Sequence, residues 1–418
     1  MAISVGHPPP QKGKSVMSWL MRALLFAAAT VFMTISCASE DQDEPDTEDA
    51  ATPSDGGDAQ VGCEEGKALV DGRCVALVLP DLKPGWTRIA PEGETTCIRG
   101  DPYSFFVRPG SVNKLLVYIS FGGFCYNALL CSEGMPNYVP AVEIDEEQLS
   151  ATPGIFAVDN PENPFKDWYT VYVPDCTADF SWGDNVVEYP ATQNAPAVTV
   201  RHKGFINATA VRHWIYENFS APEQIVFSGS SGGGDAALMH YAYVRDHYDN
   251  VEGARFVYLA DSSAGVTTDK FLTEDLLNWK AYENRPKSIP AIANASPEEL
   301  EWDFLLIEGA KFYSDDVFAE FVSAYDPYQS LTYQIMGGVL EDWNEKMEAH
   351  LRNVTENAPN FRYFVVGGGA HIILDSEAFY GHQVDGTRFV NWVDDIVNGM
   401  DVPNLHCTEC ETEKLLYE

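Results

Sequence analysis

Basic residues are scarce in this sequence of 418 residues. Lysine and arginine together number 26, against 63 aspartate and glutamate residues, so the formal net charge is −37 at pH 7. A surface with that charge repels nucleic-acid phosphates and anionic lipid headgroups at low salt. Neither nucleic acid nor an anionic membrane surface is therefore an expected binding partner.

Long apolar runs are missing as well. The apolar stretch 23–35 is shorter than the roughly 20 residues of a membrane-spanning helix, and basic residues precede it. This arrangement is typical of a secretory signal. Residues 34–37 (TISC) are similar to a bacterial lipoprotein signal, except that leucine is usual where Thr34 stands. We predict a signal over residues 1–36 and a lipid on Cys37, which would anchor an exported protein in a bacterial cell envelope. Ordinary cleavage near Cys37, followed by free secretion, is the alternative.

The next segment lacks both bases and aromatic residues. Residues 38–62 contain nine acidic residues, which repel one another, and too few apolar side chains to form a core. We therefore predict an extended acidic linker over residues 37–62.

Cysteine occurs nine times, and eight cysteines remain if Cys37 is lipidated. An even number in an exported protein indicates disulfides, here up to four. The predicted pairs are Cys63–Cys74, Cys97–Cys176, Cys125–Cys131 and Cys407–Cys410. The last pair has the spacing of half a zinc site, but no second cysteine pair or histidine pair accompanies it. We therefore predict no metal.

Strand-like and helix-like stretches alternate after a short predicted hairpin at residues 63–76. The expected strands are 114–120, 169–174, 225–228, 255–260 and 362–366, and the expected helices are 204–219, 235–248 and 388–397. Uniformly apolar strands between helices indicate an α/β fold, with a mostly parallel sheet that helices cover on both faces. The predicted domains are a small disulfide-closed segment, 63–82, and one large α/β domain, 83–418.

The turn 229–233 (GSSGG) lies between an expected strand and an expected helix. In that setting a G-x-S-x-G pattern holds a serine, here Ser231, on a sharp turn at the sheet edge, where it can act as a nucleophile. Glycine and serine also form ordinary loops, so the flanking strand and helix give this short pattern its weight.

A serine nucleophile needs a histidine base and an acid that orients the base, in the chain order Ser, acid, His for this kind of sheet. His371 fits the base, because it follows the expected strand 362–366 and a run of three glycines. Asp261 and Asp326 are both compatible with the role of the acid, and spacing does not decide between them.

Backbone N–H groups are expected to bind the oxyanion that forms when an ester is attacked. The expected donors are Gly122, Gly123 and Gly232. The first two follow a strand, where they would also form a tight turn beside the predicted Cys125–Cys131 loop.

Several blocks occur in the order of one known family: 119–125 (ISFGGFC), 172–176 (YVPDC), 202–204 (HKG), 229–233 (GSSGG), 260–262 (ADS), 325–326 (YD) and 369–371 (GAH). Over about residues 83–395, this set resembles the family of plant pectin acetylesterases and the animal carboxylesterase Notum. The resemblance implies an α/β-hydrolase-like fold and a triad of Ser231, Asp326 and His371, which selects Asp326 as the acid. It also implies the disulfides Cys97–Cys176 and Cys125–Cys131.

Three residues depart from that family's pattern. Ser230 replaces a cysteine, Gly232 replaces an alanine, and Phe121 stands where a glycine or an acid is usual. None of the three removes a triad residue. The predicted substrate pocket consists of Phe121, Phe124, Tyr126, Trp182 and Asp261, with a packed aromatic role as the alternative for Trp182.

We therefore predict a serine carboxylesterase or deacetylase that forms an acyl-enzyme and needs no cofactor. O-acetyl esters are the first candidate substrates, on a neutral glycan or on a small or lipid-like molecule, because a strongly negative domain repels polygalacturonate. The alternative is a non-catalytic surface lipoprotein that uses a hydrolase scaffold for binding.

Overall fold

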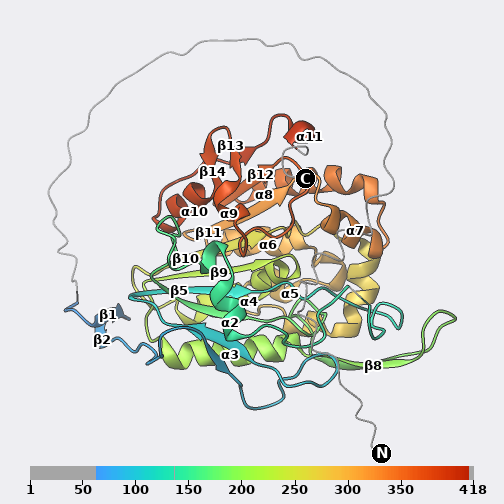
Figure 1. Cartoon of the computed structure of the whole chain (residues 1–418), viewed down its shortest axis with the longest axis horizontal. Helices are drawn as coiled ribbons and strands as arrows, with labels where there is room; N and C mark the ends of the chain where they lie inside the picture. The colour runs from blue at the N-terminus through green and yellow to red at the C-terminus, as the bar shows by residue number, and fades with distance from the viewer. Residues whose placement is uncertain (1–62, 136, 414–418) are drawn as a thin grey trace, which may run out of the picture. The chain divides into compact units, whose positions relative to one another are not determined.

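The computed structural model describes residues 63–135 and 137–413 (Figure 1). The predicted signal 1–36, Cys37 and the linker 37–62 lie outside the described residues. Within the described ranges, no helix has the length and hydropathy that a membrane span requires.

A central sheet of nine strands organises the fold, in the order β15-β12-β11-β10-β9-β5-β6-β4-β3. From β15 to β6 all neighbouring strands are parallel, whereas β4 and β3 are paired antiparallel at one edge. The strands are β3 Thr87–Ile89, β4 Phe105–Arg108, β5 Val112–Ile119, β6 Trp168–Val173, β9 Gln224–Ser230, β10 Arg255–Asp261, β11 Val317–Ser323, β12 Phe361–Val366 and β15 Leu405–His406. The predicted mostly parallel sheet is confirmed, and each expected strand is present.

Helices cover both faces of the sheet (Figure 1). Side chains of β9 alternate between the faces: Ile225 and Phe227 belong to the core that includes residues of α3, α4, α6 and α8, and Val226 belongs to the core that includes residues of α2, α9 and α10. The first group is α3 Gly204–Asn218, α4 Gly232–His247, α6 Trp302–Phe312 and α8 Trp343–Asn357, and the second is α2 Glu146–Ala151, α9 Ala378–Gly381 and α10 Phe389–Val397. Each fully buried large apolar side chain stabilises this sandwich by about 1.5–3 kcal/mol relative to its exposure.

Shorter elements fill the connections. Three hairpins are β1 Lys67–Val70 with β2 Arg73–Ala76, β7 Asn185–Tyr189 with β8 Val198–His202, and β13 Gln383–Val384 with β14 Thr387–Arg388. The segment between β10 and α6 contains η2 Phe271–Asp275, η3 Leu276–Trp279, η4 Ala281–Asn284, α5 Pro290–Asn294 and η5 Pro297–Glu299. The remaining elements are η1 Gly154–Phe156, α7 Pro327–Ile335, η6 Leu340–Asp342 and α11 Cys410–Glu413.

Four disulfides join the eight cysteines in the predicted pairs, Cys63–Cys74, Cys97–Cys176, Cys125–Cys131 and Cys407–Cys410. The first closes the β1–β2 hairpin. The last pair is a disulfide, so neither sulfur is a free thiolate for the half zinc site considered above.

Helix α4 begins at Gly232, three residues before the helix expected at 235–248. Close backbone packing explains why glycines occupy this turn and the start of the helix. A Cβ at Gly229 would lie 2.0 Å from the carbonyl oxygen of Gly233, and a Cβ at Gly233 would lie 2.2 Å from the carbonyl oxygen of Ile119. Glycine disfavours helix by propensity, but here only glycine fits the first turn.

Candidate active site

Several predicted site residues lie where parallel strands end. Gly122 follows β5, Ser231 follows β9, Asp326 follows β11 and His371 follows β12. The carboxyl ends of parallel strands meet at one edge of the sheet, which is where open α/β sheets bind ligands. The topology therefore brings these four residues to the same edge.

Ser231 occupies a sharp turn between β9 and α4. Its φ of 53° and ψ of −131° lie outside the regions that non-glycine residues favour, so the turn stores strain. The Ser231 N–H donates to the carbonyl of Asp261 at 2.8 Å, which holds the turn against β10. The side chain is partly exposed, and within the described part of the chain its hydroxyl forms no hydrogen bond.

His371 is bonded to Asp326, with 2.7 Å between Nδ1 and Asp326 Oδ2. Asp326 is fully buried and caps α7, where its Oδ1 accepts the N–H groups of Tyr328 at 2.9 Å and Gln329 at 3.0 Å. The Gln329 amide donates to Oδ2 at 2.9 Å, and the Tyr328 ring stacks on the imidazole with 4.9 Å between centroids. These contacts fix both the carboxylate and the ring.

Nearby carboxylates favour the protonated form of His371. Burial by itself would lower the pKa of the imidazole, but the attraction and hydrogen bond of Asp326, together with the weaker attraction of Asp261 and Asp375, outweigh burial. The pKa of His371 is therefore raised above 6.5. Such a histidine is a stronger base than a free imidazole and stabilises its cation beside the carboxylate.

Asp261, the other acid that spacing allowed, has different contacts. Its side chain is fully buried, and Oδ2 accepts the N–H groups of Ile373 at 2.8 Å and Leu374 at 2.9 Å and the Ser230 hydroxyl at 2.7 Å. Burial raises the pKa of this carboxyl, and the hydrogen bonds oppose that shift. Through its carboxylate and its carbonyl, Asp261 joins the turn at Ser231 to the loop that carries the histidine.

The three glycines predicted to bind an oxyanion have close neighbours that exclude larger residues. A Cβ at Gly122 would lie 2.4 Å from Cγ of Asp175, and Gly123 has a φ of 68°. Gly232 is the first residue of α4, where the N–H has no partner inside the helix. Within the described ranges, no hydrogen bond occupies the N–H groups of these glycines.

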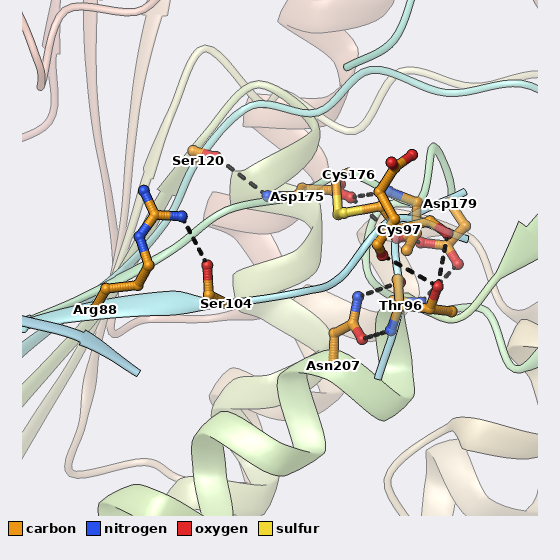
Figure 2. Close-up of a disulfide and its surroundings, with 12 residues drawn as sticks. Arg88, Thr96, Cys97, Ser104, Ser120, Asp175, Cys176, Asp179 and Asn207 are labelled. Carbon is orange, nitrogen blue, oxygen red and sulfur yellow. Dashed lines mark hydrogen bonds between the residues drawn. A yellow bond between two sulfur atoms is a disulfide. The ribbon is translucent and has the colours of Figure 1, made fainter. Parts of the chain in front are cut away.

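Asp175 lies beside the Cys97–Cys176 disulfide, and its N–H donates to the Ser120 hydroxyl at 3.2 Å (Figure 2). Its carboxyl is buried against the backbone of Gly122, and burial raises its pKa to about 6. Asp175 thus supports the loop that carries the predicted oxyanion donors.

The predicted pocket residues are mostly not accessible. Phe121 is 39% exposed, but Phe124, Tyr126, Trp182 and Asp261 are between 0% and 7% exposed. Trp182 is stacked on Trp302 with 4.7 Å between centroids, which is a packed aromatic contact, and Asp261 bonds the loop that carries His371. The assignment of these five residues to a substrate pocket stays a prediction.

Two other histidines that follow the serine are buried in the helical layer. His350 lies between Asp303, with Nδ1 to Oδ1 at 2.5 Å, and Glu320, with Nε2 to Oε2 at 2.9 Å. Burial alone would lower its pKa, but these carboxylates raise it to about 10. His240 bonds the carbonyl of Ser181 at 2.8 Å. These contacts give His350 and His240 a structural role in the buried layer, and neither histidine is a candidate for the base.

Two groups of potential metal ligands occur in the described ranges: Cys125, Cys131 and His202, and His406, Cys407 and Cys410. Every cysteine in these groups is in a disulfide, so neither offers the thiolates that a zinc site with cysteine ligands requires.

Substitution of Asp261 by asparagine tests its role as the link between the serine turn and the histidine loop. Asp261→Asn is expected to lower the free energy of unfolding by about 1–3 kcal/mol, because hydrogen bonds to a buried carboxylate are replaced by weaker bonds to an amide oxygen and the NH2 group cannot accept the Ser262 hydroxyl. Amide hydrogen exchange at Ile373 and Leu374 should accelerate. The control is Asp81→Asn, at an exposed position. Unchanged exchange at both amides in Asp261→Asn would contradict the assigned link.

Comparison with known proteins found similarity to esterases in both sequence and structure. Residues 87–279 match the pectinacetylesterase family model. Pectin acetylesterase 5 of Arabidopsis thaliana is 26% identical over 212 residues, and the match spans 47% of this chain and 47% of that relative, about half its length. Two crystal forms of the Drosophila Wnt deacylase Notum align with 79% of this chain and with 99% and 98% of their own chains, at 17% and 16% identity and a TM-score of 0.56. Residues 87–279 are therefore similar to the pectinacetylesterase family, and the chain has the α/β-hydrolase-like fold of Notum.

Proposed function

We propose that this protein is a serine carboxylesterase that removes O-acyl groups, with O-acetyl esters as its first candidate substrates. The pectinacetylesterase match supports ester hydrolysis as the class of reaction. The bond between His371 and Asp326, at the sheet edge where Ser231 occupies its strained turn, is the observation that carries the proposal.

The proposed reaction has two steps. In the first, Ser231 Oγ attacks the ester carbonyl while Nε2 of His371 takes the hydroxyl proton, and Asp326 stabilises the imidazolium. The N–H groups of Gly122, Gly123 and Gly232 stabilise the oxyanion. The tetrahedral intermediate then collapses, and His371 returns the proton to the departing alcohol. In the second step, water attacks the acyl-enzyme by the same route and releases the acid and free Ser231.

A neutral acetylated glycan, or a small ester, suits this site better than a polyanion. The net charge of −37 repels polygalacturonate at low salt. The exposed ring of Phe121, directly before the predicted oxyanion glycines, offers an apolar surface to the alcohol part of the substrate. We propose this neutral class as the alcohol side of the ester.

Replacement of the nucleophile tests the proposal directly. Ser231→Ala is expected to reduce hydrolysis of p-nitrophenyl acetate by about 10⁶-fold and to abolish labelling by a fluorophosphonate probe. Ser228→Ala, a buried strand serine bonded to the Leu259 carbonyl, is the matched control and should keep the label. Thermal unfolding checks that both variants fold. An active, labelled Ser231→Ala protein would exclude the mechanism, and an inert, unlabelled wild type would favour a binding protein.

The pH dependence tests the pair of Asp326 and His371. The base must be neutral to accept a proton, so kcat/KM should fall as the pH drops through the raised pKa of His371, above 6.5. Asp326→Asn keeps a good helix cap but removes the charge. The acidic limb should then shift to lower pH, and the plateau should fall by about 10⁴-fold.

Glu348→Gln provides a matched control for that experiment, because Glu348 bonds His406 at 2.8 Å in a separate carboxylate–histidine pair. Its pH profile should equal that of the wild type. An Asp326→Asn profile with the same acidic limb as the wild type would contradict the proposed pair.

We also propose that the protein is exported and lipid-anchored at Cys37. Four disulfides fit an oxidising compartment outside the cytoplasm. Cys37→Ser is expected to move the protein from the membrane fraction of a bacterial host to the soluble fraction. Mass spectrometry of the mature N-terminus should find a lipid on Cys37 in the wild type. A soluble wild-type protein that begins near Cys37 without lipid would support simple secretion instead.

A further inference from the structure

The loop 177–183, which follows β6, has an unusual backbone. Ala178, Phe180 and Ser181 have φ values of 53°, 53° and 54°, in the left-handed region that residues other than glycine rarely adopt. In this region Cβ lies too close to the following carbonyl oxygen, so each such residue costs free energy. Strain of this kind persists only where the surrounding structure enforces it, and it is concentrated at functional sites.

Buried polar groups hold the loop in this shape. Asp179, which is fully buried, accepts the Thr177 hydroxyl at 2.6 Å and the Ser181 N–H at 3.0 Å with Oδ1, and the Gly204 N–H at 3.0 Å with Oδ2. The preceding Cys176 is fixed by its disulfide (Figure 2). The conformation is therefore determined on both sides of Phe180.

The loop places the Phe180 ring against the residue after the nucleophile. A Cβ at Gly232 would lie 2.6 Å from Cδ1 and 2.9 Å from Cε1 of Phe180. The proposed mechanism uses the N–H of Gly232 to bind the ester carbonyl oxygen. The ring therefore lies beside the residue whose N–H is proposed to bind that oxygen.

Other aromatic rings leave Phe180 little freedom to move. Its centroid lies 5.4 Å from those of Phe124 and Trp279, 6.2 Å from that of Trp302 and 6.4 Å from that of Phe271. Phe180 is 3% exposed, and these four neighbours are equally buried or more so. The space beside Gly232 is therefore filled by packed rings instead of being an open channel.

We propose that Phe180 closes the acyl side of the site and restricts the enzyme to short acyl groups such as acetyl. This inference rests on the esterase function proposed above. A longer chain would have to displace a ring that is held by a hydrogen-bonded loop and by four aromatic contacts. An acetyl group adds only a methyl beyond the carbonyl and requires no such displacement.

Hydrolysis of p-nitrophenyl acetate and octanoate measures the restriction. In the wild type, kcat/KM for acetate should exceed that for octanoate by about 100-fold or more. Phe180→Gly removes the ring and suits the positive φ, so the ratio of acetate to octanoate should fall by about tenfold or more. Phe180→Leu, which keeps more of the core packing, should give an intermediate ratio. Because both substrates are compared in one sample, the ratio does not depend on the folded fraction.

Phe256→Leu is the matched control, since Phe256 is buried near the opposite end of β10 from Asp261, and its ratio should equal that of the wild type. A wild type that hydrolyses both esters equally, or Phe180 variants with an unchanged ratio, would overturn the role of Phe180 and leave the esterase function intact. A wild type inert to both esters would overturn the esterase function and the inference together.

Discussion

The buried carboxylate of Asp261 connects two chain segments that the candidate mechanism requires to work together. Its Oδ2 accepts hydrogen bonds from the Ser230 hydroxyl, directly before the candidate nucleophile, and from the N–H groups of Ile373 and Leu374, shortly after His371. A buried carboxyl is stabilised only when hydrogen bonds replace its lost hydration. The serine turn and the histidine loop are thus held by the same atom, although 140 positions separate residues 231 and 371.

Strain and close packing define the rest of the site. Ser231 and Phe180 both have positive φ values, and glycines at 229 and 233 allow backbone segments to approach within distances that any side chain would block. Such arrangements cost free energy locally and persist because the surrounding sheet, disulfides and aromatic core are rigid. The backbone conformations of the candidate site therefore depend on the packing of the whole α/β fold.

Asp326 combines a structural and a proposed chemical role. It caps α7 through two backbone N–H groups and bonds His371, while Gln329 connects it to Ala264 through a hydrogen bond of 2.9 Å. Because the helix donors keep one carboxylate oxygen occupied, the other is directed at the imidazole. The segment that follows β10 is thereby coupled to the orientation of the histidine.

Strand periodicity and the ordered motifs predicted the mostly parallel sheet, the residues that end the strands and the three cysteine pairs that are close in sequence, because these depend on local pattern. The Cys97–Cys176 pair spans 79 residues and was predicted from the remaining cysteines and the family resemblance. Propensity misplaced the start of α4, since Gly233 fits against β5 and Gly232 against Phe180, both far away in the sequence. Only the tertiary structure showed that Trp182 stacks on Trp302, that Asp326 bonds His371 and that Phe180 lies beside Gly232. Those contacts join segments far apart in the chain, and no local pattern encodes which side chains meet across a core.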